Sequence, residues 1–104
     1  MKIPSSLELQ LLAVLEDGPR HGYSLREELR RRSAGVFDPL PGTLYPLLRR
    51  LEIGGLVDSA WQAGPRRRRR VYRLTAAGGR ELDLRLREWV EFVGAVTAVI
   101  GGGE

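Results

Sequence analysis

The residues best suited to chemistry in this chain are two groups of arginines. Arg49 and Arg50 end the segment PGTLYPLLRR at residues 41–50, and five consecutive arginines follow at residues 66–70. A guanidinium group carries N–H donors in a planar fork that matches a phosphate or the edge of a guanine. The two groups therefore indicate that the chain binds a polyanion, with nucleic acid as the expected partner.

Residue types that catalyse reactions are sparse. The chain has one histidine, His21, no cysteine, and acidic residues that do not cluster. Nucleophilic catalysis needs a nucleophile beside a base, and a metal site needs several ligands close together. We therefore expect no enzyme activity, no metal site and no cofactor. His21 precedes Gly22 at the start of a predicted helix, so we expect it to make a structural hydrogen bond there.

Positive charge is concentrated in the middle of the chain. The 104 residues carry a net charge of +4, but residues 20–73 hold 13 arginines against 5 acidic residues, a net +8, and each flank carries −2. A polyanion-binding module has this distribution. The lack of cysteine, of a long apolar run and of a signal-peptide pattern predicts a cytoplasmic protein.

Apolar periodicity predicts three helices in the first part of the chain, over 6–17, 22–33 and 41–54. Ser5 or Ser6 caps the first helix, with Glu8 at capping-box spacing from Ser5. The apolar residues of this helix cover more than one face, so we expect one side to pack on its own domain and the other on a partner. Phe37, in the connector before the third helix, is expected in the core.

The predicted helix over 41–54 has one apolar and one polar face. The apolar face comprises Leu44, Leu47, Leu48 and Leu51. The outward side chains suited to phosphate or base-edge contacts are Thr43, Tyr45, Arg49 and Arg50. For Tyr45, packing in the core with its hydroxyl at the rim is the alternative.

Two strands, over 56–62 and 69–74, are predicted to form a hairpin with arginines at its tip. The arginines are Arg66, Arg67, Arg68, Arg69 and Arg70. Adjacent cations repel one another unless an anion or water screens them. We therefore expect this wing to contact a phosphate backbone or a narrow minor groove, and to be a solvated loop in the free protein.

A helix of about 25 residues is predicted after Thr75, its N-cap. Its apolar residues are spaced alternately by four and three, the pattern of a seam between two helices. Since a domain this small has little core left for such a helix, we expect a homodimer interface. The interface comprises Leu82, Leu86, Trp89, Val93, Val96 and Ile100. Trp89 is either an interface anchor or one wall of a site for a planar effector.

The predicted fold is mainly α with a small β-hairpin, a winged helix-turn-helix followed by a long C-terminal dimerisation helix. We expect the DNA-binding domain over 1–75, the dimerisation helix over 76–100 and a disordered tail over 101–104. The expected partner is a double-stranded, palindromic DNA operator. Two other classes stay open: a winged-helix module for protein–protein interaction, and an RNA-binding module that uses the basic wing.

Six short motifs form a linked set: LLAVL at 11–15, GPRHGY at 18–23, PGTLYPLLRRLE at 41–52, GLV at 55–57, GPRRR at 64–68 and YRLTAAG at 72–78. Together they make residues 7–92 resemble the PadR family of bacterial transcriptional regulators, in its short form with one C-terminal helix. The resemblance implies a homodimeric winged-helix repressor, often released from its operator by a small aromatic or lipophilic effector.

The resemblance also implies DNA contact by Tyr45, and by Thr43 and Arg49. For Trp89, the resemblance implies an effector site as an alternative to an interface anchor. The chain departs from the family pattern in its run of five arginines and in a valine-rich terminal helix that contains Gly94. The second departure leaves the identity of an effector open.

Overall fold

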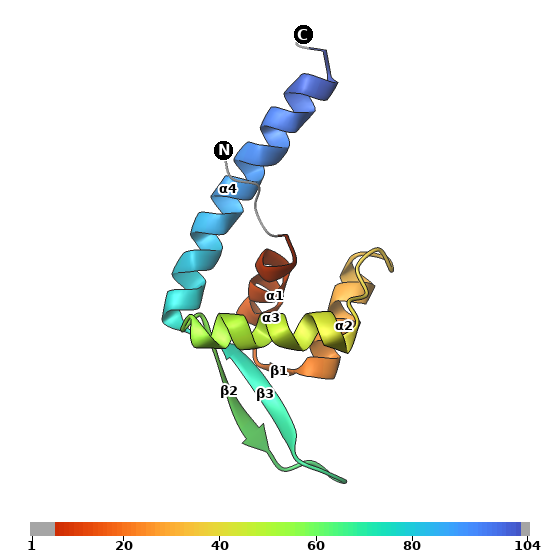
Figure 1. The fold of residues 1–104 in the computed structure, drawn as a ribbon, viewed down its shortest axis with the longest axis vertical. Helices are drawn as coiled ribbons and strands as arrows, with labels where there is room; N and C mark the ends of the chain where they lie inside the picture. Colours follow the sequence, from red (N-terminus) through yellow and green to blue (C-terminus); the bar gives the residue numbers. More distant parts are fainter. Residues whose placement is uncertain (1–5, 103–104) are drawn as a thin grey trace.

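The structure, a computed structural model, describes residues 6–102, which form four helices and a three-stranded sheet (Figure 1). In chain order the elements are α1 (Ser6–Glu16), β1 (Arg20–His21), α2 (Gly22–Arg32), α3 (Pro41–Ile53), β2 (Val57–Gln62), β3 (Arg69–Leu74) and α4 (Ala76–Ile100). The prediction of a mainly helical protein with a small hairpin is confirmed, and the bounds of the four predicted helices and two predicted strands differ from those observed by one residue at most. Ser5, one of the two predicted caps, lies outside the described residues.

Helix α1 is buried over most of its surface by the rest of the chain. It packs against α2, α3, α4 and β3. Its buried residues are Glu8, Leu9, Leu11, Leu12, Val14 and Leu15. Most of both apolar faces is thus covered within the single chain, and packing of the half-buried Leu7 and Ala13 on a partner stays a prediction. Periodicity identifies two apolar faces but not the element that covers the second, and here α4 of the same chain packs against α1.

The sheet has the order β1–β3–β2, and both pairs of strands are antiparallel. Strands β2 and β3 form the hairpin, in register from Val57 opposite Leu74 to Gln62 opposite Arg69. Strand β1 is only two residues long, too short to show any periodicity, and the sequence analysis does not predict it. Its pairing with β3 ties the start of α2 to the hairpin.

Helix α4 packs on the core through its first half only. Its buried residues are Gly78 and Leu82, and Trp89 packs at the edge of the core. The prediction that Leu82 belongs to a dimer seam is wrong: Leu82 is 3% exposed within the single chain and lies in its own core cluster. The rest of α4 extends away from the domain, and the hairpin projects from the opposite end (Figure 1). No helix within residues 6–102 is long and apolar enough to cross a bilayer.

Helix α4 ends at Gly101, its C-cap residue, which is followed by Gly102. The Gly101 N–H donates to the Thr97 carbonyl at 2.8 Å, and the Gly102 N–H donates to the Val99 carbonyl at 3.3 Å. These two residues of the predicted tail thus form a turn, and residues 103–104 lie outside the described part of the chain.

Phe37 is not in the core, contrary to the prediction. Its ring is 42% exposed, at the rim of a hollow of about 240 Å³ between α1 and α2. The backbone N–H of Phe37 donates to Ser33 Oγ at 2.9 Å, and the same hydroxyl donates to the Leu29 carbonyl at 2.7 Å. These bonds tie the connector to the last turn of α2, so the ring remains at the surface.

The junction of β3 and α4 requires glycine at position 78. Thr75 is the N-cap of α4, as predicted: its Oγ1 accepts from the Gly78 N–H at 2.9 Å and donates to the Gly55 carbonyl at 2.7 Å. A Cβ at position 78 would overlap the carbonyl oxygen of Leu56. The first turn of α4 therefore lies so close to the start of β2 that no residue with a Cβ fits at position 78.

Gly78→Ala is expected to lower the free energy of unfolding by ~1–3 kcal/mol, because the helix must move away from Leu56. The matched control is Gly79→Ala. A Cβ there meets nothing within 4 Å, and the change should stabilise the helix by ~0.5–1 kcal/mol. Urea unfolding followed by circular dichroism measures both. Equal stabilities for the two variants would contradict the close approach.

Candidate nucleic-acid interface

The outward face of α3 carries the polar residues assigned by the sequence analysis. The buried residues of this helix are Leu44, Leu48 and Leu51, and the exposed ones include Thr43, Tyr45, Arg49 and Arg50. The helix continues through Pro46, which lacks the N–H that would bond to the Gly42 carbonyl. Both residues are exposed, so water can bind that carbonyl. The predicted division into an apolar and a polar face is confirmed, with Leu47 half-buried.

Tyr45 packs against the first turn of α2. A Cβ on Gly22 would lie 2.5 Å from the Tyr45 hydroxyl oxygen and 2.6 Å from its Cε1, so the ring fits there only because residue 22 is glycine. The ring is also 43% exposed. Tyr45 therefore packs on α2 with part of its ring and leaves the rest of the ring exposed to solvent.

The arginine run is divided between the hairpin loop and β3. The loop holds Arg66, Arg67 and Arg68, and β3 begins with Arg69 and Arg70. The Cζ atoms of Arg68 and Arg70 lie 5.1 Å and 5.4 Å from the centroid of the Trp61 ring. Both distances are within the range of cation–π attraction. Trp61, which the sequence analysis does not assign to the site, thus holds two guanidinium groups on the hairpin.

Arg70 is half-buried and is bound within the chain. Its Nε donates to Ser59 Oγ at 2.8 Å, and its Nη2 lies 3.4 Å from Glu52 Oε2. The Ser59 hydroxyl donates to the same carboxylate oxygen at 2.6 Å. Glu52 belongs to α3 and Ser59 to β2. The three side chains therefore fasten the hairpin to α3, so Arg70 contributes to positioning the wing.

A groove of about 410 Å³ separates the hairpin from the helices, and we call it the wing groove. It is lined by His21, Gly22, Tyr23, Tyr45, Trp61, Tyr72 and the four arginines at 67–70. No aspartate or glutamate among residues 6–102 lines it. The groove brings together Tyr45 of α3 and the arginines of the wing, two groups that are separate in the sequence. It is positively charged because the lining has no acidic residue to offset its arginines.

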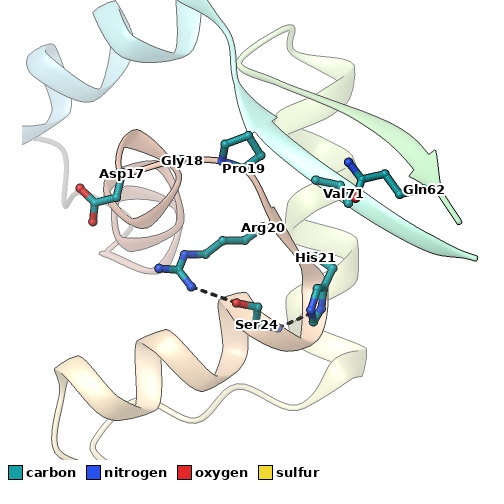
Figure 2. A pocket seen from close by; sticks show the side chains of 8 residues that line it. All are labelled: Asp17, Gly18, Pro19, Arg20, His21, Ser24, Gln62 and Val71. Carbon is teal, nitrogen blue, oxygen red and sulfur yellow. Dashed lines mark hydrogen bonds between the residues drawn. The ribbon is translucent and has the colours of Figure 1, made fainter. Parts of the chain in front are cut away.

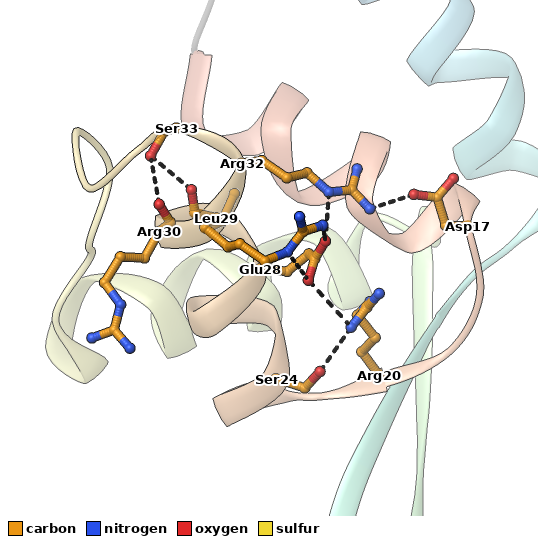
Figure 3. Close-up of polar contacts among 9 residues, drawn as sticks. Asp17, Arg20, Ser24, Glu28, Leu29, Arg30, Arg32 and Ser33 are labelled. Atoms are coloured by element: carbon orange, nitrogen blue, oxygen red, sulfur yellow. Dashed lines mark hydrogen bonds and ion pairs between the residues drawn. The ribbon is translucent and has the colours of Figure 1, made fainter.

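Two of the three arginines in the last turn of α2, Arg31 and Arg32, are bound to Glu28, and Figure 3 shows the contact of Arg32. Glu28 accepts hydrogen bonds from Arg31 and, at 2.8 Å, from Arg32, and these bonds lower its pKa to about 2. Arg32 also pairs with Asp17. The ionised Glu28 side chain stabilises the fold above its ordinary pKa of 4.5, and this contribution is lost as the pH falls towards 2. Acids within the chain thus offset Arg31 and Arg32, whereas the arginines at 66–69 of the wing have no ion pair within the described residues.

A polar hollow of about 420 Å³ lies beside β1 (Figure 2). At its edge, His21 Nδ1 accepts from the Ser24 backbone N–H at 3.3 Å, and Arg20 Nη1 donates to Ser24 Oγ at 2.9 Å. The prediction that His21 makes a structural hydrogen bond at the start of a helix is confirmed. Within residues 6–102, no three potential metal ligands lie close enough together to hold an ion.

Glu8 connects three helices and is 8% exposed. Its Oε1 accepts from Arg85 Nη1 of α4 at 3.0 Å, and its Oε2 lies 3.7 Å from Arg50 Nη1 of α3. The predicted capping-box partner of Glu8, Ser5, lies outside the described residues, and no periodic pattern shows that the Glu8 carboxylate meets two distant arginines. This contact links α4 to the polar face of α3.

Most of the proposed seam on α4 is exposed. Leu86, Val93, Val96 and Ile100 are between 40% and 80% exposed. Trp89 is half-buried, and its ring centroid lies 5.9 Å from that of Phe92. Apart from Leu82, the stripe therefore remains an apolar surface on a helix that extends beyond its own domain.

Comparison with known proteins identifies the family. Residues 11–84 match the sequence profile described as "Transcriptional regulator PadR-like family". The chain belongs to the PadR-like family of transcriptional regulators. The transcriptional regulator Rv3488 of Mycobacterium tuberculosis is 43% identical over 74 residues, which span 71% of this chain and 66% of that protein, slightly under two thirds of its length.

Solved structures agree with this assignment. The protein smu.1704 of Streptococcus mutans UA159 superposes with a TM-score of 0.82 at 27% identity, over 100% of this chain and 97% of that one. A PadR family transcriptional regulator of Eggerthella lenta DSM 2243 gives a TM-score of 0.77 at 33% identity, over 91% and 78% of the two chains. The resemblance, the winged-helix fold and the role of a transcriptional regulator, as opposed to an enzyme, are confirmed.

Proposed function

We propose that this PadR-like regulator binds a palindromic duplex operator as a homodimer, and that it represses transcription until a small aromatic or lipophilic effector releases it. The main support is that Tyr45 of α3 and the arginines of the wing line one positively charged groove. A helix can bind in the major groove while a hairpin contacts the adjacent phosphate backbone only if both lie on the same face of the protein. We place the protein in the cytoplasm, where it meets its DNA.

The exposed stripe on α4 supports the proposed dimer. The helix and the hairpin project from opposite ends of the chain (Figure 1), so two chains joined through α4 keep both wings accessible. The two α3 helices would then enter successive major grooves about 34 Å apart. In this proposal the DNA-binding unit extends to residue 75, and residues 76–100 form the dimerisation helix.

Arg49→Ala is expected to weaken binding to the preferred operator by ~1–3 kcal/mol more than binding to random duplex DNA, because a contact to a base edge carries sequence information. Tyr45→Phe keeps the ring on Gly22 and removes only the hydroxyl, so any loss of affinity reports a DNA contact. Operator selection from random duplexes, followed by fluorescence anisotropy, gives both affinities. The control Arg80→Ala removes one exposed charge from α4. Equal losses for Arg49→Ala on both kinds of DNA would exclude base readout.

For the effector, planar lipophilic compounds should quench the fluorescence of Trp89 and lower operator affinity. A Trp61→Phe background isolates the Trp89 signal, since the chain has two tryptophans. Linkage requires that operator DNA weaken effector binding by the same factor. If a broad panel of such compounds changes neither the Trp89 signal nor operator affinity, Trp89 is an interface anchor and the regulatory input lies elsewhere.

A further inference from the structure

The wing groove exposes aromatic rings that duplex DNA cannot stack on. Besides its arginines it exposes aromatic rings: Tyr23 is 59% exposed, Trp61 54% and Tyr45 43%. The bases of a duplex are stacked inside it, so a duplex presents phosphates to this groove but no free ring face. Rings beside guanidinium groups suit a ligand that carries both a planar ring and an anionic group.

The size and charge of the groove match a small ligand of this kind. Its volume of about 410 Å³ lies within the ~300–1,000 Å³ typical of ligand sites. Among residues 6–102, no ion pair involves Arg67, Arg68 or Arg69. Three guanidinium groups are thus available to an anion, while Arg70 is offset by Glu52 at 3.4 Å.

Two of the rings, those of Tyr45 and Trp61, are held in place before any ligand arrives. Tyr45 is fixed against Gly22, and Trp61 lies opposite Arg70 in the hairpin register with Arg68 also over its ring. The Arg69 guanidinium is 3.4 Å from His21 Nε2, whose other nitrogen caps α2. This pre-organisation reduces the entropy that a ligand loses by ordering side chains on binding.

We propose that the wing groove binds a planar aromatic phosphate of nucleotide size, and that its occupation excludes DNA directly. The second part rests on the proposed function, because it requires the same arginines to contact the operator. The shared chemistry is a ring beside a phosphate, supplied by a free nucleotide or by an unpaired nucleotide of a single strand. This site is separate from Trp89 and needs no change of shape to act on DNA binding.

Calorimetry on the full chain tests the site with three probes: AMP, inorganic phosphate and adenosine. AMP should bind at least about tenfold more tightly than either of the others, because it alone engages both rings and arginines. Equal binding of AMP and inorganic phosphate would overturn the proposal and leave a simple cationic patch. A short oligothymidylate, compared per nucleotide with thymidine monophosphate, identifies which of the two sources is preferred.

Variants locate the site. Trp61→Ala should abolish the preference for AMP over inorganic phosphate, and Trp61→Phe should retain that preference. Arg68→Ala should weaken AMP binding, whereas Arg80→Ala, which removes the same charge from α4, should not. An AMP preference that survives Trp61→Ala would place the site elsewhere and overturn the proposal. Circular dichroism checks that each variant is folded.

A competition titration tests the exclusion of DNA. With AMP at ten times its dissociation constant, the apparent affinity for the operator should fall about tenfold or more. Operator binding that is unaffected by saturating AMP would overturn direct exclusion. If AMP binds with the expected dependence on Trp61 but no duplex binds at all, the proposed function fails and the ligand site stands, so the two failures are distinguishable.

Discussion

Replacing Arg66 and Arg67 with alanine is expected to weaken binding to every duplex sequence and to flatten its dependence on salt. Counterion release contributes about −0.9 to the slope of log K against log salt for each phosphate contact. A dimer that loses two such contacts per chain, four in all, should therefore show a slope smaller in magnitude by about 3.6. At physiological salt, affinity for the operator and for random DNA should fall together by a factor of ten or more. Anisotropy titrations across a salt series measure both quantities.

The matched control for this experiment is Arg80→Ala with Arg87→Ala. Both residues are exposed on α4, and their replacement changes the net charge by the same amount. If the wing arginines bind phosphate directly, the control should change the slope much less. Equal changes in the two double variants would indicate a general effect of net charge. An unchanged slope in the wing variant would rule out phosphate contact by the hairpin loop.

Val93→Asp is expected to convert the proposed dimer to a folded monomer. In the single chain Val93 is 42% exposed, so the new carboxylate is solvated there and should not disturb folding. At an apolar seam the same carboxylate would be buried without a partner, at a cost of ~3–5 kcal/mol. The dissociation constant of the dimer should rise at least a hundredfold. Sedimentation equilibrium measures this change, and operator affinity should fall because the half-sites are no longer linked.

Ala95→Asp provides the control for the seam. Ala95 is exposed and lies outside the stripe that contains Val93 and Val96. The Ala95→Asp substitution adds the same charge on the same helix but outside the stripe, so the proposed dimer should persist. A folded Val93→Asp dimer, or equal effects of the two variants, would show that α4 does not associate through this stripe. A wild-type chain that sediments as a monomer would contradict the proposed dimer itself.

Much of the fold is predictable from local patterns. The buried leucines of α3, the strand bounds 69–74 and the Thr75 cap follow from spacing and residue type, because each reflects interactions within a few residues along the chain. The concentration of arginines in residues 20–73 is likewise a property of the sequence alone. These features predict a mainly helical protein with a basic hairpin.

The tertiary structure decides which surfaces meet. It places Leu82 in the chain's own core, joins Glu8 to Arg85 and brings Tyr45 onto Gly22. Each of these contacts joins different elements, and apolar periodicity states only that a face is buried, not what covers it. The sequence by itself therefore determined the elements, their faces and the charge. Only the packing of α1, α3, α4 and the hairpin determined that the arginines and aromatic rings line one groove, since that depends on contacts between residues far apart in the chain.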